Sequence, residues 1–289
     1  RSRGLGDVYK RQDMSFDEMI ETTKIHSIAG TLKHDGLITT RPFRSPHHTV
    51  TPVGLGGGGT GTIRPGEVSL ANNGVLFLDE LPEFSRTALE VLRQPIEDGS
   101  ITISRAGQKC TYPCSIMVVA AMNPCPCGYY GDATRKCTCS EQKIKHYLNR
   151  ISGPLLDRFD IHVEVPAVKF EELRDASSAE CSADIKKRAD RAREIQRERF
   201  KGSKTTCNAK INAEQFEKVC IIDKEAEKTL KDAFESLGLT ARAYDRVLKV
   251  ARTIADLDES EIIRSEHVLE AVQYLSLIHI SEPTRPLYI

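Results

Sequence analysis

A run of four apolar residues followed at once by two acids is the feature that most limits what this chain can fold into. The run is Val75–Leu78, and Asp79 and Glu80 come next. An unbroken apolar run of this length is typical of a strand buried on both faces, as in a parallel sheet. Open α/β sheets place ligands at the carboxyl ends of their strands. The sequence therefore predicts an α/β domain with two carboxylates at a ligand-binding edge.

Two adjacent carboxylates at such an edge suit the hydrolysis of a nucleoside triphosphate. One carboxylate can hold Mg²⁺ on the phosphates while the other orients the attacking water. Asp79 and Glu80 thus form a Walker B pattern, in which the second acid favours hydrolysis over binding alone. The alternative is a buried strand that ends by chance in an acidic turn.

Strand and helix patterns alternate in the first part of the chain, and only helical patterns follow. The expected strands are 75–78, 116–122 and 161–165, with a hairpin of 101–104 and 110–112. The expected helices are 16–28, 85–97, 141–150, 184–200, 223–236, 240–256 and 265–275. This order predicts an α/β core over residues 13–167 and a small all-α lid domain over residues 168–275.

Composition and the chain ends narrow the class of protein further. The 41 basic and 41 acidic residues cancel, so any contact with nucleic acid must come from local patches. No apolar run approaches the ~20 residues of a membrane span. Nine cysteines in such a chain favour the reducing cytoplasm, with free thiols or a metal site. Residues 1–12 and 276–289 look like translated sequencing adapters, so we expect artefact tails around an internal fragment of a longer protein.

A glycine run, Gly54–Gly59, matches the pattern GxGxxG but lacks the context of a phosphate-binding loop. The residues after it cannot form a helix, and no Lys-Ser or Lys-Thr pair follows. We therefore expect a flexible loop here. The pattern GxxxxGK[ST] occurs nowhere in the sequence, so the Walker A loop is expected upstream. The fragment alone is then expected not to hydrolyse ATP.

Three further polar residues stand where phosphate chemistry could use them. Asn123 ends the apolar strand 116–122 and could position a water, although Asn-Pro turns are common. Arg158 could stabilise phosphoryl charge, or simply pair with Asp157 or Asp160. Arg242 lies in the first turn of a helix, where a cation opposes the helix dipole, which suggests a phosphate partner or an ordinary surface arginine.

Two CxC pairs separated by nine residues predict a metal site. Cys125 and Cys127 form the first pair, and Cys137 and Cys139 form the second. Four thiolates on one loop suit a tetrahedral structural Zn²⁺, although the usual spacing is CxxC. Free thiols in a loop are the alternative.

Cationic and aromatic side chains gather in two segments that could contact a phosphate backbone. The first segment lies near a Pro-rich turn, and the second is the tip of the expected hairpin. The candidate DNA contacts are Arg44, His47, His48, Arg105 and Lys109.

Taken together, the longer strings of this sequence resemble the magnesium-chelatase-like AAA+ ATPase family, specifically its ComM/YifB-type branch. The resemblance covers residues 13–275. The strings that carry it are Phe43–His48, Arg64–Glu67, Gly74–Phe84, Ala121–Gly128, Ser152–Asp160, Ala241–Tyr244 and Ala251–Leu257.

The resemblance implies a fold and a set of site residues. It implies a P-loop NTPase core with a parallel sheet and hairpin insertions, followed by a helical lid. Asp79 and Glu80 would be the Walker B acids on Mg-ATP, and Asn123 would be sensor 1. Arg158 would be an arginine finger that acts on the ATP of a neighbouring subunit, and Arg242 would be sensor 2.

The resemblance also implies an assembly and an activity. Members of this branch form hexameric rings, with the hairpin near Arg105 pointing into the ring, and carry an upstream Lon-protease-like domain and a Walker A loop. They use ATP and Mg²⁺ to drive DNA branch migration or helicase-type remodelling in recombination and transformation. Two alternatives stay open: a magnesium-chelatase motor subunit, and a non-catalytic zinc-binding scaffold.

Overall fold

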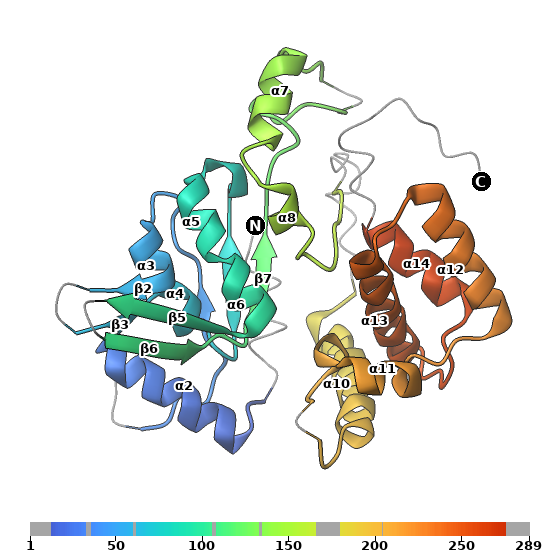
Figure 1. The fold of residues 1–289 in the computed structure, drawn as a ribbon, viewed down its shortest axis with the longest axis horizontal. Helices are drawn as coiled ribbons and strands as arrows, with labels where there is room; N and C mark the ends of the chain where they lie inside the picture. The colour runs from blue at the N-terminus through green and yellow to red at the C-terminus, as the bar shows by residue number, and fades with distance from the viewer. Residues whose placement is uncertain are drawn as a thin grey trace. The chain divides into compact units, whose positions relative to one another are not determined.

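A computed structural model of the chain describes residues 13–32, 36–59, 62–105, 108–132, 135–165, 180–203 and 205–275. The chain divides into two compact units, Arg1–Phe159 and Asp160–Ile289. The first unit is mixed α/β and the second is helical, as Figure 1 shows. The expected boundary after residue 167 lies outside the described residues. None of the described helices is long and apolar enough to cross a membrane.

A three-stranded parallel sheet forms the centre of the first unit. Its order is β1 (Phe43–Arg44), β4 (Val75–Leu78) and β7 (Met117–Ala120). All four residues of β4 are buried, as expected for the central strand. Gly74 lets β4 approach β1, because a Cβ there would lie 2.0 Å from the carbonyl oxygen of Pro42. The parallel α/β core predicted from the sequence is thus confirmed.

Helices and two small antiparallel sheets surround this sheet. The hairpin of β5 (Ser100–Arg105) and β6 (Gln108–Pro113) is longer than expected, and β2 (Gly57–Gly58) pairs with β3 (Arg64–Pro65). Helix α2 begins with a capping box formed by Ser15 and Glu18. The helices of this unit are α2 (Phe16–Ala29), α3 (Pro52–Gly56), α4 (Glu67–Leu70), α5 (Arg86–Val91), α6 (Arg93–Asp98), α7 (Glu141–Leu148) and α8 (Gly153–Leu156), with the 3₁₀ turn η1 (Leu81–Glu83).

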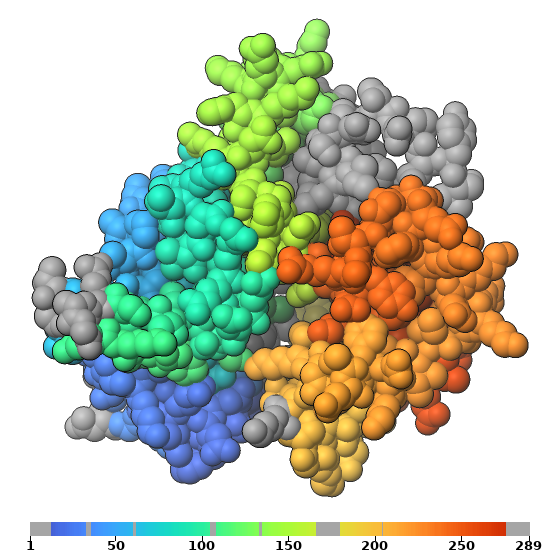
Figure 2. Space-filling view, in the orientation of Figure 1, coloured from blue at the N-terminus to red at the C-terminus, as the bar shows by residue number. Residues whose placement is uncertain are grey.

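One hydrophobic core joins these elements. It draws side chains from α3, α4, β4, α5 and α8, including Leu55, Val68, Leu76, Leu89 and Leu155, each at most 2% exposed. Full burial of a leucine contributes about 1.5–3 kcal/mol. Helix α7 lies beyond the carboxyl end of β7 and projects from the body of the unit (Figures 1 and 2).

Three sequence expectations about elements were wrong. The helix expected over 85–97 is broken into α5 and α6 at Leu92, because Pro95 cannot donate a backbone hydrogen bond to the preceding turn. The glycine run is not a loop throughout, since Gly54–Gly56 end helix α3 and Gly57–Gly58 form β2. Residues 161–165 belong to no strand in the described part of the chain; the amide of His162 instead donates to the carbonyl of Tyr274, at 2.7 Å.

The second unit is a helical bundle with its own core. Its elements are α10 (Ser182–Arg199), η3 (Asn208–Lys210), α11 (Ala213–Val219), α12 (Lys224–Leu237), α13 (Ala241–Leu257) and α14 (Ser265–Leu275). Val247, Leu248 and Ala251 of α13 are at most 2% exposed and pack into this core. Helix α13 thus provides the central apolar face of the bundle.

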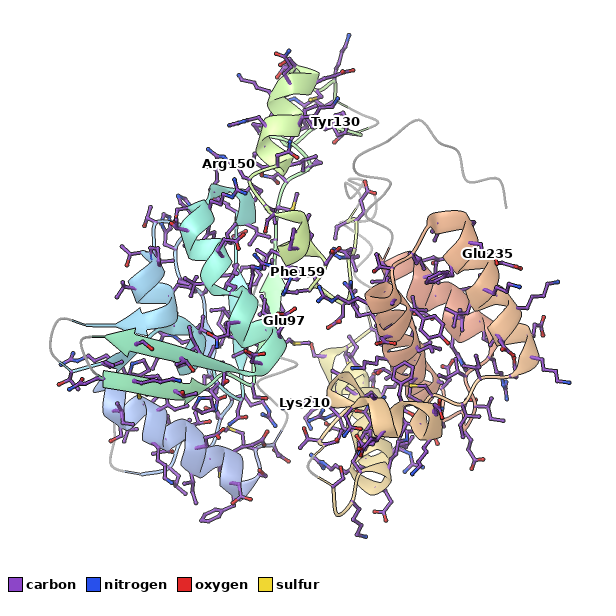
Figure 3. All side chains as sticks on the ribbon, in the orientation of Figure 1. Glu97, Tyr130, Arg150, Phe159, Lys210 and Glu235 are labelled. Carbon is purple, nitrogen blue, oxygen red and sulfur yellow. The ribbon has the colours of Figure 1, made fainter. Side chains whose placement is uncertain are left out.

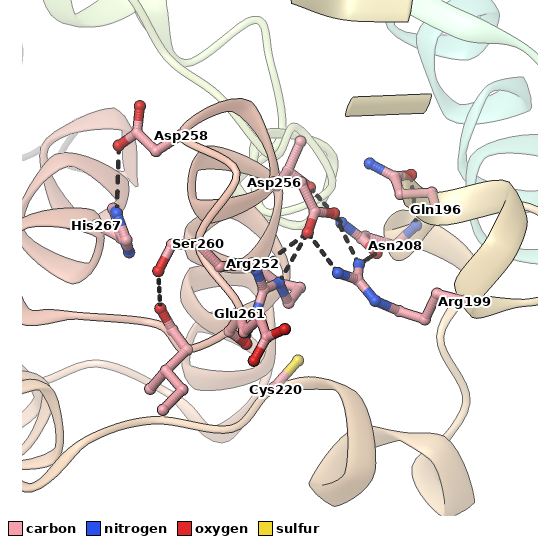
Figure 4. A network of polar contacts seen from close by, with 12 residues as sticks. Gln196, Arg199, Asn208, Cys220, Arg252, Asp256, Asp258, Ser260, Glu261 and His267 are labelled. Carbon is pink, nitrogen blue, oxygen red and sulfur yellow. Dashed lines mark hydrogen bonds and ion pairs between the residues drawn. The ribbon is translucent and has the colours of Figure 1, made fainter. Parts of the chain in front are cut away.

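A buried ionic network fastens the helices of the second unit to one another (Figure 4). The carboxylate of Asp256 accepts from Arg199 at 2.5 and 2.7 Å, from Asn208 at 2.7 Å and from Arg252 at 3.1 Å. The remaining nitrogens of Arg252 donate to the carbonyls of Ser260 and Glu261. Burial lowers the pKa of Arg252, and the neighbouring Asp256 opposes that shift. Every charge here has partners, as buried charges require.

Candidate functional site

The carboxyl ends of β4 and β7 meet at one edge of the sheet. Leu78 pairs with Ala120, and beyond this pair Ala121 donates to Leu78 at 2.9 Å. Leu81 in turn donates to Ala121 at 3.0 Å. The chain segments that bear Asp79–Glu80 and Asn123 therefore leave adjacent parallel strands side by side. The acidic pair and the amide thus belong to the same edge of the sheet.

The acidic pair is exposed and its backbone is unusual. Asp79, Glu80 and Asn123 are all exposed, whereas β4 behind them is buried. Glu80 has φ 55°, in the left-handed region that non-glycine residues rarely adopt. The amide of Glu80 donates to a carboxylate oxygen of Asp79 at 3.0 Å. Such backbone strain is concentrated at functional sites, where the surrounding structure holds it in place.

His48 contacts the side chain of Glu80. Its Nδ1 lies 3.0 Å from Oε2 of Glu80, in a turn that follows β1, the other neighbour of β4. The ring of His48 lies tilted against that of His47, with centroids 4.0 Å apart, and makes a T-shaped contact with the buried Phe84. The sequence singled out His48 only as a DNA candidate. Its contact with Glu80 was missed, because nothing in the sequence pattern pairs the ends of strands that lie apart along the chain.

The other candidate DNA contacts are in different surroundings. Arg44 forms a bidentate ion pair with Glu67, with N–O distances of 2.6 and 2.7 Å, and this hydrogen bonding raises the pKa of Arg44. Lys109 is exposed near the end of the hairpin, whereas His47 is exposed beside the acidic pair. Residue 105 ends β5, and its side chain lies outside the described residues.

Arg158 lies just past α8, after the C-cap residue Asp157. Its side chain is only 8% exposed and forms an ion pair with Glu97 of α6, rather than with Asp157 or Asp160. A second nitrogen, Nη1, donates to the carbonyl of Pro154, while Nε is buried with no hydrogen-bond partner among the described residues. Figure 3 labels Glu97 on α6 and Phe159 beyond α8. The sequence offered no signal for this pairing.

Arg242 belongs to the second unit. It is exposed in the first turn of α13, two residues after the N-cap Thr240, whose hydroxyl accepts from Ala243. Arg242 and the sheet edge belong to different units of the chain. The role of Arg242 as a phosphate contact stays a prediction.

The four cysteines of the two CxC pairs converge as the spacing predicted. Their sulfur atoms all lie within 4.8 Å of one another, and Cys125 is fully buried. The sulfurs of Cys125 and Cys127 are 3.3 Å apart, too far for a disulfide, and all nine cysteines of the chain are free. A group of four thiols at this separation can hold a metal ion.

The chemistry of the four thiols also fits a bound cation. The backbone amides of Tyr129 and Thr138 lower the pKa of Cys127 to about 5. The pKa of Cys137 is lowered by the amide of Cys139, but burial and the nearby Cys127 and Cys125 raise it overall, to about 12. Several thiolates this close repel one another unless a cation lies between them.

The cysteine loop is attached to the polar edge of the sheet. Cys125 follows Asn123 by two residues, and Ser140 at the other end of the loop caps α7. Tyr147 of α7 forms a hydrogen bond with the backbone of Asn123, which lowers its pKa, although burial raises that pKa overall. The loop and α7 therefore help to fix the segment that carries Asn123.

Comparison with known proteins supplies the family. A family model described as magnesium chelatase, subunit ChlI, matches residues 11–173, and the model of the ChlI C-terminal region matches residues 179–275. Competence protein ComM of Haemophilus influenzae is 43% identical over 269 residues, which is 93% of this chain and 52% of ComM. Protein YifB of Escherichia coli K12 is 44% identical over 275 residues, 93% of this chain and 53% of YifB.

A more distant relative is the maternal DNA replication licensing factor mcm6 of Xenopus tropicalis, 25% identical over 236 residues, which is 76% of this chain and 27% of that protein. The chain spans about half the length of ComM and YifB. The ChlI model covers more than half of the chain. The chain is also 43–44% identical to both bacterial proteins over 93% of its own length. The chain therefore belongs to the magnesium chelatase ChlI family of AAA+ ATPases, in its ComM/YifB branch.

Proposed function

We propose that the full-length protein carrying this chain is an ATP-hydrolysing motor that remodels DNA. The observation that carries the proposal is the meeting of Asp79, Glu80 and Asn123 at the carboxyl edge of adjacent parallel strands. Open α/β sheets bind ligands at that edge. Exposed acids at the end of a fully buried strand contribute little to the core of the fold, which favours a task in chemistry.

Each polar residue of the edge has a separate proposed role. Asp79 would hold Mg²⁺ together with the bound ATP, and Glu80 would orient the water that attacks the γ-phosphorus. Asn123, on the neighbouring strand, holds that water or the γ-phosphate by hydrogen bonds. His48 fixes the carboxylate of Glu80 from the other side. When bound, ATP would supply the phosphoryl group and Mg²⁺ would neutralise its charge, while these side chains would position the phosphates and the attacking water.

Two arginines complete the pocket from elsewhere. Arg158 serves the pocket of a neighbouring subunit, which requires a ring, and we propose a hexamer. Arg242 contacts phosphate from the helical lid. The planar, permanently charged guanidinium suits both tasks, because it can donate two parallel hydrogen bonds to phosphate oxygens.

DNA is the proposed substrate of the motor, in branch migration or helicase-type remodelling during recombination and transformation. The names of relatives support this choice: ComM is a competence protein, and mcm6 is a DNA replication licensing factor. His47, Lys109 and Arg105 are the proposed DNA contacts, with Arg44 constrained by its pairing with Glu67. Such a motor acts in the cytoplasm, which agrees with nine free cysteines.

The cysteine cluster is proposed to hold a structural Zn²⁺. Cys125, Cys127, Cys137 and Cys139 supply four sulfurs, which matches the closed tetrahedral coordination of structural zinc sites. The metal would fold the loop between Asn123 and α7 rather than take part in hydrolysis.

A second candidate function is suggested by the family name. A magnesium-chelatase motor subunit would use the same ATPase edge to drive insertion of Mg²⁺ into a porphyrin. The rate of steady-state ATP hydrolysis by the full-length protein distinguishes the DNA motor from the chelatase subunit. The rate is measured without DNA, with single-stranded DNA, with duplex DNA and with a four-way junction. A DNA motor is expected to accelerate with at least one of these DNAs. A rate indifferent to all of them would remove the DNA proposal and leave the chelatase reading.

A further inference from the structure

The ion pair between Arg158 and Glu97 conflicts with the proposed work of Arg158 in a neighbouring pocket. An arginine that stabilises charge on another chain's nucleotide must present its N–H groups at the surface of its own chain. Here the side chain is 8% exposed, with Nη2 on Glu97 and Nη1 on the carbonyl of Pro154. In this position the guanidinium is not available to a phosphate.

The backbone around Arg158 is firmly held, so the side chain alone decides its availability. Arg150 pairs with Glu83 at 2.8 Å, and the hydroxyl of Ser152 donates to Glu90 at 2.9 Å. Leu155 of α8 is fully buried in the core of the first unit. These contacts tie residues 150–156 to η1 and α5. Release of Arg158 therefore needs a rotamer change and no unfolding of the segment.

Two features of the ion pair between Arg158 and Glu97 make it easy for another anion to displace Glu97. The Nε of Arg158 is buried without a partner among the described residues, and a buried N–H in that condition is unfavourable. Glu97 is in the last turn of α6, where the helix dipole disfavours a carboxylate. The side chain of Glu97 is also 42% exposed, so solvent weakens the pair.

We propose that Glu97 is an internal substitute for phosphate, which holds Arg158 withdrawn until the ATP of a neighbouring copy takes it over. The proposal rests on the trans role of Arg158 given above. A single exposed carboxylate carries less charge than a triphosphate, so the incoming nucleotide wins the competition for the guanidinium. Glu97 thereby raises the protein concentration needed for ATP-dependent assembly, and it acts as a positioning residue for Arg158.

The test is ATP-dependent assembly of the full-length protein in a Glu80→Gln background, which is expected to bind ATP without turning it over. Mass photometry over a range of protein concentrations gives the concentration at half-assembly. Adding Glu97→Gln should lower that concentration roughly two- to tenfold, the range expected for loss of one partly exposed ion pair. Glu97→Asp, which keeps the charge on a shorter side chain, should give a smaller shift in the same direction.

Two controls make the measurement specific to the pair. Asp98→Asn removes an exposed carboxylate next to Glu97 and should leave the half-assembly concentration unchanged. In a background that also carries Arg158→Ala, Glu97→Gln should have no effect, because no guanidinium is left to release. A thermal melt of each variant identifies loss of folding.

Three results would overturn the proposal. The first is a folded Glu97→Gln variant that assembles at the same or a higher concentration, and the second is an effect that persists without Arg158. The third is full ATPase activity in Arg158→Ala, which would instead remove the trans role on which the proposal rests. Failure of the Glu97 variants with an inactive Arg158→Ala would refute only the withdrawal of Arg158 by Glu97.

Discussion

The sheet edge of the first unit and the ionic network of the second use the same kinds of side chains in opposite ways. Around Asp256, two arginines and an asparagine satisfy a carboxylate that is fully buried. At the sheet edge, Asp79 and Glu80 are exposed, and Glu80 has a left-handed backbone. Buried charges with complete partners hold a fold together, whereas exposed charges on a strained backbone indicate chemistry. Mutations at the sheet edge should therefore change the rate of ATP hydrolysis, whereas mutations in the network around Asp256 should change the stability of the fold.

Arg158→Ala is expected to give the largest effect. Arginine fingers contribute about 10³- to 10⁵-fold to turnover, so kcat for ATP should fall by roughly 10³-fold or more. Mixing Arg158→Ala subunits with Glu80→Gln subunits should restore part of the activity, because some interfaces then combine an intact arginine with an intact pocket. Arg93→Ala, which removes a half-buried arginine of α6 that pairs with Glu90 of α5, serves as the control and should stay active. No recovery in the mixture would indicate a purely structural arginine.

Asp256→Ala should be the most damaging change to stability. Removing one partner of a buried ion pair typically costs about 3–5 kcal/mol, because Arg252 would be left buried without its counter-charge. Hydrogen exchange of α13 in the full-length protein measures the loss locally. Asp79→Ala, by comparison, should change stability by no more than about 0.5 kcal/mol, since its side chain is exposed. Equal destabilisation by both variants would erase the distinction between the two regions.

Loss of metal should affect the cysteine loop more than the rest of the protein. The full-length protein should contain about one zinc ion per chain by elemental analysis. Cys125→Ser should lower that content well below one and make residues 125–139 more sensitive to protease. Cys181→Ser, which alters an exposed cysteine outside the cluster, should leave both readings unchanged. Wild-type protein that contains no zinc and still resists protease at the loop would contradict the site. A full zinc content in Cys125→Ser would contradict it as well.

His48→Ala should give the smallest effect. Without the 3.0 Å contact from His48, the Glu80 carboxylate samples more rotamers, so kcat should fall about two- to tenfold with KM for ATP unchanged. His47→Ala removes the ring that lies against His48 but keeps the contact between His48 and Glu80, so kcat should fall less than in His48→Ala. A rise in kcat for His48→Ala would show that His48 withholds Glu80 instead of orienting it.

Local pattern was enough to predict the centre of the fold. The apolar run 75–78, the hairpin and the late helices follow from periodicity and capping residues, and the structure has them. The second strand, expected over 116–122, is present as the shorter β7. The cysteine cluster followed from spacing on one loop. In each case the interacting residues lie close in sequence or repeat with a fixed period, so the signal is contained in a short window.

The failures involve contacts between distant segments. The apolar residues 161–165 suit a strand, but a strand needs a neighbouring strand to pair its backbone groups. The backbone amide of His162 instead donates to the carbonyl of Tyr274. Pro95 breaks a helix whose side-chain pattern runs on. The pairs Arg158–Glu97 and His48–Glu80 join residues whose proximity depends on the tertiary fold, and no sequence window contains both members.

The most direct test of the proposed catalytic edge is the effect of Glu80→Gln in the full-length protein, with ATP turnover and ATP affinity measured on the same preparation. The exchange preserves shape and removes only the charge that orients the water. We predict that kcat falls by at least about 10²-fold while the Kd for ATP changes by less than about threefold. An unchanged kcat, with ATP bound normally, would show that Glu80 and the sheet edge it belongs to are not the hydrolytic centre.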